Sequence, residues 1–323
     1  MSVEKVTVAD ADDGLRLDRW FRRHYPHLTH GRLEKLLRRG EIRVDGGRVR
    51  AGHRLAAGMV VRVPPLPAAE SPPPAAAPPP VSAADAEVLR ARVLHRDDMI
   101  LVIDKPAGLA VQGGSGTARH LDGMLDALRF DADERPRLVH RLDRDTSGVL
   151  VLARTRKAAA AVGAAFQDRA ARKLYWALVH GSPDAPVGRW DTFMEKKAGG
   201  RGEQVGSGAD GKRAVTLYRV LGRSDSAYAW LALTPLTGRT HQLRVHCAEA
   251  GLPIVGDPRY GERRDRPAAG TLGRGLHLHA RALEMPHPAG GILRANAPLP
   301  PHMEQSWCFL GFDPGAEPTW PDD

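Results

Sequence analysis

Cysteine is scarce in this sequence, because only two of its 323 residues are cysteines, Cys247 and Cys308. Two cysteines cannot build a disulfide framework, and their spacing does not match that of metal-binding pairs. Such scarcity is typical of proteins kept in a reducing compartment. We therefore expect both thiols to be free and buried, and the chain to be cytoplasmic.

Long apolar runs are also missing. A helix needs about 20 consecutive apolar residues to span a bilayer, and no stretch of the sequence approaches that length. Residues 1–13 are acidic, unlike the basic and then apolar start of a secretory leader. Hydrophobic residues make up 42% of the chain, which is enough for a core. We therefore expect a globular protein with no membrane partner.

Acidic residues are rare between residues 14 and 64, where 13 Lys and Arg stand against 4 Asp and Glu. This excess equals the net charge of +9 of the whole chain. Apolar residues at helical spacing predict two short helices, near residues 15–23 and 29–40, with basic side chains on their outer faces. Alternating residues and a glycine turn predict a small hairpin over residues 42–63.

Basic side chains on two successive helices, with few acids to balance them, favour phosphate contact over a merely solvated face. The candidate RNA-binding side chains are Arg16, Arg19, Arg32, Lys35, Arg38 and Arg39. The segments RLDRWF, GRLEKLLRRGEIRVDG and LAAGMVVRV resemble the RNA-binding domain of small-subunit ribosomal protein S-four. This likeness covers nearly all of residues 14–64, and we expect the RNA-binding domain to comprise residues 1–64.

The composition changes after this first domain. Residues 65–85 are rich in Pro, Ala and Ser, which predicts an extended, semi-rigid linker. A second domain is expected over residues 86–312, followed by a disordered acidic tail at 313–323. Residues 195–212 are rich in glycine and charge, which predicts a long loop within the second domain.

The stretch HRLDRDTSG, residues 140–148, places charged side chains directly before the apolar run VLVLA. That run predicts a strand buried on both faces, so Asp143 and Asp145 stand where a sheet core begins. A carboxylate in such a place is either neutralised by an arginine or used as a nucleophile or base. Alternatively, both aspartates only cap a turn through backbone amides.

Two later stretches carry further polar residues. Residues 172–179 predict a central strand, in which a single tyrosine, Tyr175, is more often a packing residue than a catalytic one. A helix is expected to begin near Thr240, and its periodicity places Arg244 on a different face from the apolar Leu243.

Five segments occur in a fixed order behind the basic domain: KPAG, HRLDRDTSGVLVLA, KLYWALV, TGRTHQLRVH and GDPRYG. Together they resemble the RluA-type family of pseudouridine synthases over about residues 94–300. The details VQGGSG and HRLDRDTSGVLVLA resemble its RluC-like branch, whose members modify uridines of 23S large-subunit ribosomal RNA. The resemblance implies an α+β fold, with a mixed, largely antiparallel central sheet flanked by helices next to the small helix-and-hairpin domain.

The resemblance also implies roles for individual residues. Asp143 matches the catalytic aspartate, and Arg141 matches the arginine that takes the place of the flipped uridine. Tyr175 matches the tyrosine that stacks on the target base, and Arg244 matches the arginine that pairs with the catalytic carboxylate. Asp145 keeps a structural role in capping the turn. No metal or nucleotide cofactor is implied, because the isomerisation involves no redox change and no gain or loss of atoms, and we expect a monomer.

Two other interpretations stay open from the sequence. The run from Asp143 to Thr146 also fits the Asp-x-Asp-x-Thr signature of magnesium-dependent phosphatases, although its apolar strand follows the motif instead of preceding it. No later acidic pair is suitably placed for the metal. The other interpretation is a non-catalytic RNA-binding factor, because the fold could survive a loss of activity.

Overall fold

The computed structural model describes residues 3–66, 82–113, 119–199, 202–208, 210–225, 227–261 and 271–322. The chain divides into two compact units, Met1–Pro79 and Pro80–Asp323. Most of the expected linker, residues 65–85, lies outside the described residues. Its last part is helical instead of extended, because α3 (Ala83–Arg90) begins there and the Ser82 hydroxyl caps it by accepting the Asp85 N–H at 3.0 Å.

The first unit packs two helices on a small sheet. Its elements are β1 (Glu4–Thr7), a 3-10 turn (Asp10–Asp12), α1 (Leu17–His24), α2 (His30–Arg39), β2 (Arg43–Val44) and β3 (Val60–Val63). The three strands are antiparallel in the order β1-β3-β2. Trp20 and Phe21 of α1 and Leu33 and Leu37 of α2 are buried, as their helical spacing predicts. Gly40 ends α2 with a φ of 72°, a backbone conformation that favours glycine.

The second unit is built on one large sheet. Its strands are β4 (Val93–Arg96), β5 (Ile100–Lys105), β6 (Arg137–Leu138), β7 (Ser147–Ala153), β8 (Arg172–His180), β9 (Val187–Gly199), β10 (Gly202–Ser207), β11 (Lys212–Ser224), β12 (Tyr228–Pro235), β13 (Leu278–Pro286) and β14 (Ile292–Asn296). The order is β10-β9-β11-β12-β8-β13-β7-β5-β4, with β14 added on β13 and β6 on β7. Among these described strands only β7 and β13 pair in parallel. The predicted α+β fold with a largely antiparallel sheet is confirmed.

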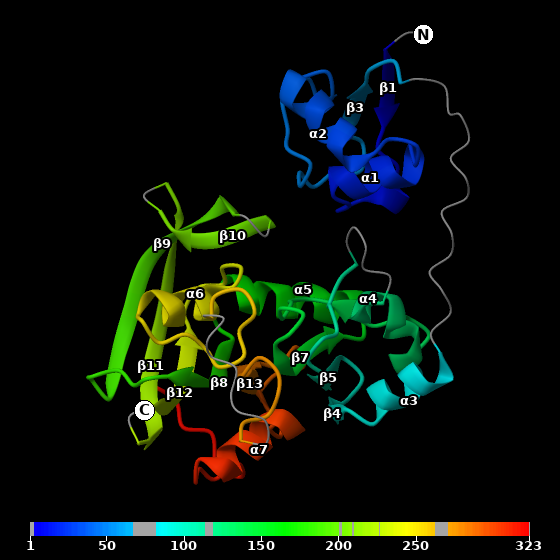
Figure 1. Ribbon diagram of the computed structural model, residues 1–323. Helices are drawn as coiled ribbons and strands as arrows, with labels where there is room; N and C mark the ends of the chain where they lie inside the picture. Colours follow the sequence, from blue (N-terminus) through cyan, green and yellow to red (C-terminus); the bar gives the residue numbers. More distant parts are fainter. Residues whose placement is uncertain are drawn as a thin grey trace. The chain divides into compact units, whose positions relative to one another are not determined.

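Helices cover both faces of this sheet. They are α4 (Leu121–Met124), the 3-10 helix η2 (Leu125–Leu128), α5 (Arg156–Gln167), α6 (Gln242–Glu249) and α7 (Pro301–Phe309). In β8, Ala177 packs in one apolar cluster with Cys247 of α6, whereas its neighbour Trp176 packs with Trp307 of α7. Successive side chains of a strand point to opposite faces. Helices α6 and α7 therefore lie on opposite sides of β8 (Figure 1).

Strand β7 is the apolar run predicted from the sequence, and all seven of its residues are buried. Leu150 packs with the cluster around α4, and Val151 packs with the cluster around α5. Gly148 has a φ of 109°, and a Cβ added there would lie 2.2 Å from the carbonyl oxygen of Ala280 in β13. The glycine thus permits the close parallel pairing of β7 with β13.

The prediction of a long loop at residues 195–212 is wrong. Strand β9 continues to Gly199 and pairs in antiparallel register with β10, and β11 begins at Lys212. Residues 200, 201 and 209 lie outside the described part of the chain. The hairpin was missed because backbone pairing forms it, while its glycine-rich sequence lacks the apolar alternation of a half-buried strand.

The expected disordered tail at residues 313–323 is also wrong for the described residues 313–322. Trp320 is only 7% exposed and belongs to the apolar cluster around Trp307. The Asp322 carboxylate lies 2.8 Å from the guanidinium of Arg172 on β8. One tryptophan that can be buried is enough to fix an otherwise polar segment on the sheet.

The two thiols differ in exposure. Cys247 on α6 is buried, as expected. Cys308 on α7 is exposed, so the expectation of two buried thiols is wrong for Cys308. No helix in the described part of the chain combines the length and the apolar character that a membrane span requires.

Candidate active site

The loop before β7, residues 140–146, carries the charged motif. The Thr146 N–H donates to the Asp143 carbonyl at 3.3 Å and closes the turn. Asp145 was expected to cap this turn. Its carboxylate instead lies 3.4 Å from Nε of the neighbouring Arg144, and both side chains are at least partly exposed to solvent. The motif therefore forms a short turn that leads directly into a buried strand.

Lys105, at the end of β5, stabilises this loop through hydrogen bonds from its buried side chain. The side chain is fully buried, and its Nζ donates to the carbonyls of Pro106 at 2.8 Å, Leu109 at 2.8 Å and Arg144 at 3.0 Å. Burial lowers the pKa of Lys105 to about 7, although the nearby charges of Asp145 and Asp143 act to raise it. Sequence reasoning quoted KPAG as a motif but gave Lys105 no role.

A cavity of about 690 Å³ opens beside this loop. The predicted Asp143, Arg141, Tyr175 and Arg244 all line it. They come from the loop before β7, from β8 and from α6, which are distant in the sequence. The structure thus gathers the four residues into one site of a size typical for small-molecule ligands.

Asp143 lies at the wall of the cavity with its side chain 19% exposed. The only ion-pair partner within 4 Å of its carboxylate, among the residues described, is His241 Nε2 at 3.9 Å. This distance is too long for a hydrogen bond. The carboxylate is therefore partly buried and available to a bound molecule.

Arg244 does not pair directly with Asp143, which corrects the expectation from the sequence. Its guanidinium forms a bidentate ion pair with Asp257, with both distances 2.7 Å and both side chains at most 5% exposed. Burial acts to lower the pKa of Arg244, but the hydrogen bonds and charge of Asp257 and the charge of Asp143 raise it overall. Asp143 and Arg244 thus attract each other electrostatically without a direct hydrogen bond.

Asp257 belongs to the GDPRYG segment, and sequence reasoning did not select it. One of its oxygens also accepts the backbone N–H groups of Arg259 at 2.8 Å and Tyr260 at 3.0 Å. Burial acts to raise the pKa of Asp257, yet Arg244 and these amides lower it overall. Arg244 pairs with Asp257 instead of Asp143 because the backbone amides of the turn already hold the Asp257 carboxylate in position.

Tyr175 lies in β8 and packs against two apolar clusters. Burial and the charge of Asp143 raise the pKa of its hydroxyl well above the usual value. The hydroxyl therefore stays protonated at neutral pH and is a poor base. Arg141 is exposed, and it lines the same cavity.

His241, like Lys105 and Asp257, was given no role from the sequence. It lies at the N-cap position of α6 with a φ of 55°, and its ring lines the cavity. Its Nδ1 lies 2.8 Å from the hydroxyl of Tyr260. The signal for this residue was a histidine at a predicted helix start within THQLR.

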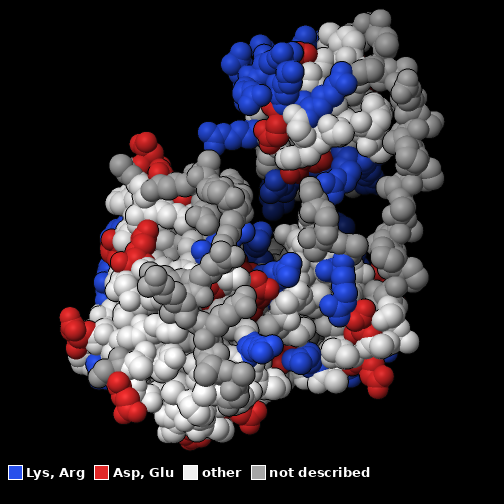
Figure 2. Space-filling model, viewed as in Figure 1, with Lys and Arg blue, Asp and Glu red and all other residues white. Residues whose placement is uncertain are grey.

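The six basic candidates of the first unit all have exposed side chains. They are Arg16, Arg19, Arg32, Lys35, Arg38 and Arg39. Figure 2 shows Lys and Arg side chains gathered on this unit. Two of the six have acidic neighbours, because Arg16 lies 2.7 Å from Asp18 and Arg39 lies 3.7 Å from Glu41. Arg19, Arg32, Lys35 and Arg38 form no ion pair with any other residue that the structure describes.

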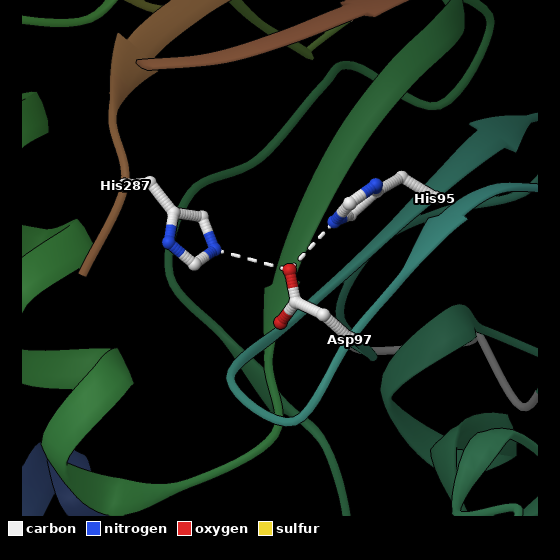
Figure 3. A group of neighbouring side chains, drawn as sticks. All are labelled: His95, Asp97 and His287. Atoms are coloured by element: carbon white, nitrogen blue, oxygen red, sulfur yellow. Dashed lines mark hydrogen bonds and ion pairs between the residues drawn. The ribbon is translucent and has the colours of Figure 1, made fainter. Parts of the chain in front are cut away.

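One group in the described part of the chain has the spacing of metal ligands, namely His95, Asp97 and His287 (Figure 3). Both Nε2 atoms lie on the same Asp97 oxygen, at 2.6 and 3.0 Å. The backbone N–H of Ala289 donates to His287 Nδ1 at 3.1 Å, so the neutral ring carries its proton on Nε2. A ligating histidine needs a lone pair on that atom. The hydrogen bonds therefore suit a structural role better than metal binding, and we call His95, Asp97 and His287 the clasp.

Asp97 holds this clasp together. Burial acts to raise its pKa, but hydrogen bonds from the two imidazoles and from two backbone amides lower it to about 2. The clasp joins the turn between β4 and β5 to the end of β13, and none of its members lines the cavity around Asp143.

Comparisons with known proteins show which family the chain is similar to. Residues 99–249 match the RNA pseudouridylate synthase family. The chain is 38% identical over 306 residues to ribosomal large subunit pseudouridine synthase C of Salmonella typhimurium, covering 92% of this chain and 93% of that protein. The protein of the same name from Escherichia coli K12 has the same identity and coverage.

Two solved human structures are similar to this chain in fold. RNA pseudouridylate synthase domain containing 4 has a TM-score of 0.60 at 30% identity, covering 70% of this chain and 95% of that chain. RNA pseudouridylate synthase domain containing 1 has a TM-score of 0.55 at 29% identity, covering 67% of this chain and 86% of that chain.

The chain belongs to the RNA pseudouridylate synthase family. Within the family it falls in the RluA-type, RluC-like branch, as the sequence motifs implied. The enzyme is accordingly a pseudouridine synthase, an isomerase of uridine in RNA. These findings favour this activity over the magnesium-dependent phosphatase and over the non-catalytic RNA-binding factor.

Proposed function

We propose that this enzyme isomerises specific uridines of 23S large-subunit ribosomal RNA. The observation that carries the proposal is the gathering of Asp143, Arg141 and Tyr175 in one cavity of about 690 Å³, in a chain that resembles ribosomal large subunit pseudouridine synthases over most of its length. The proposal extends to the roles of these residues.

Asp143 acts on the nucleoside. In the reaction the bond from ribose C1′ to uracil N1 breaks, the uracil turns and C1′ bonds to C5. C5 loses a proton and N1 gains one, so no atoms are lost or gained overall. One carboxylate can serve as nucleophile and electrostatic stabiliser when a glycosidic bond is broken and remade, as in retaining glycosidases. Asp143 is a carboxylate at the wall of the cavity, partly buried and without a hydrogen-bonded counterion among the described residues, whereas Asp322, which also lines the cavity, is paired with Arg172.

Arg141 and Tyr175 receive the nucleotide. A stacked uridine has to be flipped out before Asp143 can reach it, at a cost on the order of a few kcal/mol. The exposed Arg141 fills the position that the uridine leaves, and the ring of Tyr175 stacks on the uracil. Burial keeps the Tyr175 hydroxyl protonated, so Tyr175 does not act as a base in this proposal.

The first unit supplies affinity for RNA phosphates. Arg16, Arg19, Arg32, Lys35, Arg38 and Arg39 are the contact residues of this proposal, and all are exposed. Phosphate contacts position an RNA without reading its sequence. The choice of uridine is therefore made at the cavity of the second unit. The proposal also includes a cytoplasmic location, a monomer and a reaction without a cofactor.

The test compares two neighbouring aspartates. Asp143→Asn is expected to abolish pseudouridine formation while RNA affinity stays within about two-fold, because the amide keeps the shape but cannot act as a nucleophile. Asp145→Asn is the matched control and should retain most activity. Pseudouridines are mapped in ribosomal RNA from cells that lack the gene and carry each variant. Product at wild-type level with Asp143→Asn would remove Asp143 from the mechanism, and an unchanged pattern in cells lacking the gene would reject 23S RNA as the substrate.

A further inference from the structure

His241 occupies the place near Asp143 that the sequence assigned to Arg244. Arg244 is hydrogen-bonded to Asp257, and Nε2 of His241 lies 3.9 Å from the Asp143 carboxylate. The backbone of His241 is left-handed, with a φ of 55°. For a residue with a Cβ this conformation costs roughly 1–2 kcal/mol, and it persists only where the surroundings impose it. The fold therefore holds this ring in place against its local preference.

The hydrogen bonds of Tyr260 fix which ring nitrogen of His241 carries the proton. The Tyr260 hydroxyl accepts the backbone N–H of Val205, in β10, at 3.3 Å. The same oxygen lies 2.8 Å from His241 Nδ1. The backbone donor occupies one acceptor position of the hydroxyl oxygen, and donation of the hydroxyl proton to Nδ1 then uses the donor of Tyr260 as well. The neutral ring then carries its own proton on Nε2, the nitrogen that faces Asp143.

Burial keeps the His241 ring neutral. Burial is the largest effect and lowers the pKa of His241, and the cations Arg244 and Arg259 lower it further. The carboxylates of Asp143 and Asp257 act in the opposite direction but do not outweigh them. A neutral N–H donor can bond to a carboxylate without taking its charge away.

We propose that His241 is a positioning residue for Asp143. Its Nε2–H donates to the carboxylate when a bound nucleoside draws the two side chains together, and it aims the ionised oxygen at the nucleoside. Catalytic hydrogen bonds are often long in an unoccupied site and shorten in the complex. The inference rests on the proposed role of Asp143, and it assigns Tyr260 to holding the ring.

The test measures kcat and KM on an RNA substrate at neutral pH. His241→Ala is expected to lower kcat about 10- to 100-fold with KM within about two-fold, which is the size expected for one hydrogen bond to a charged group. His241→Gln places a neutral N–H donor near the same point and should recover most of kcat. Tyr260→Phe removes one oxygen and should lower kcat by several-fold.

A further variant distinguishes the loss of the His241 ring from a loss of folded protein. His241→Gly also removes the ring but suits the φ of 55°, so a thermal midpoint near that of the wild type is expected with the same loss of kcat. Wild-type kcat in His241→Gly, or a Gln variant no better than Ala, would overturn the inference. If Asp143→Asn keeps its activity, the proposed function fails instead, whatever the His241 variants do. Inactive Asp143→Asn with fully active His241→Gly overturns only the inference.

Discussion

Arg244 and Asp257 form a bidentate ion pair inside the wall of the cavity, with both hydrogen bonds 2.7 Å long. This pair fixes the start of α6, where His241 stands, to the GDPRYG turn that carries Tyr260. The predicted contact between Arg244 and Asp143 is thereby replaced by a buried structural link next to the site.

Breaking this link should destabilise the second unit strongly. Asp257→Asn leaves the Arg244 guanidinium buried without its counterion, and losses of about 3–5 kcal/mol are typical of such changes. Urea unfolding measures the effect. The control is Asp191→Asn. Asp191 is likewise an ion-paired aspartate, but its two arginine partners lie on the surface, so the unfolding midpoint of this variant should hardly change. Equal effects of the two substitutions would contradict the structural role of the buried pair.

Gly148→Ala should disrupt the pairing of β7 with β13. The new methyl group would lie 2.2 Å from the Ala280 carbonyl oxygen, which is backbone and cannot move aside alone. We expect a loss of folded protein, or of activity because the Asp143 loop is displaced. Gly163→Ala in α5 is the control, since nothing lies within 4 Å of the added Cβ, and it should raise stability by about 0.5–1 kcal/mol. Circular dichroism melting distinguishes the two outcomes.

The salt dependence of RNA binding tests the basic surface of the first unit. Replacing Arg32, Lys35, Arg38 and Arg39 together with Gln removes four candidate phosphate contacts. The slope of log affinity against log salt should become shallower by roughly 3, since each lost contact removes about 0.7–0.9. Arg294→Gln serves as a control, because the Arg294 side chain on β14 is exposed in the second unit, and it should leave the slope nearly unchanged. An unaltered slope in the fourfold variant would exclude this surface from binding.

His279 should make the enzyme less stable in acid. It lies fully buried beside β7, with Nδ1 2.9 Å from the Ser147 hydroxyl and Nε2 3.3 Å from the Ala297 carbonyl. Burial lowers its pKa from 6.5 to about 3. Between these pH values the unfolded chain binds a proton that the folded chain does not, so the free energy of unfolding falls as the pH falls.

One such group contributes a slope of up to about 1.4 kcal/mol per pH unit in that window. Urea unfolding at pH 7, 6 and 5 gives the slope for the wild type and for His279→Gln, in which the group no longer titrates. The variant should show the shallower slope. Parallel lines for the two proteins would mean that His279 is not the titrating group.

The sequence predicted those parts of the fold that follow from local patterns. Strand β7 and helices α1 and α2 show their apolar periodicity directly, and Gly40 marks a helix end. The motif order led to the family and to four residues that share one cavity. The edge strand β1 was missed because none of its side chains is fully buried, so it shows no apolar alternation.

Partners across the fold could not be predicted in the same way. Which carboxylate Arg244 binds depends on where the turn at Asp257 places its oxygens, and this follows from contacts among α6, β10 and the turn. The role inferred for His241 likewise depends on Tyr260, whose position no spacing in the sequence gives. Trp320 shows the same limit, because its burial depends on a tertiary cluster that forms around Trp307.

The unequal burial of the two cysteines gives the enzyme a built-in reporter. A maleimide dye added to the folded chain should attach to Cys308 on α7 alone, since Cys247 is enclosed and burial raises the pKa of its thiol well above the usual value. Cys247 follows Arg244 on the same helix, so its thiol becomes reactive only when α6 lifts from the sheet. The rate of that second labelling step therefore measures how often the helix carrying Arg244 opens in solution.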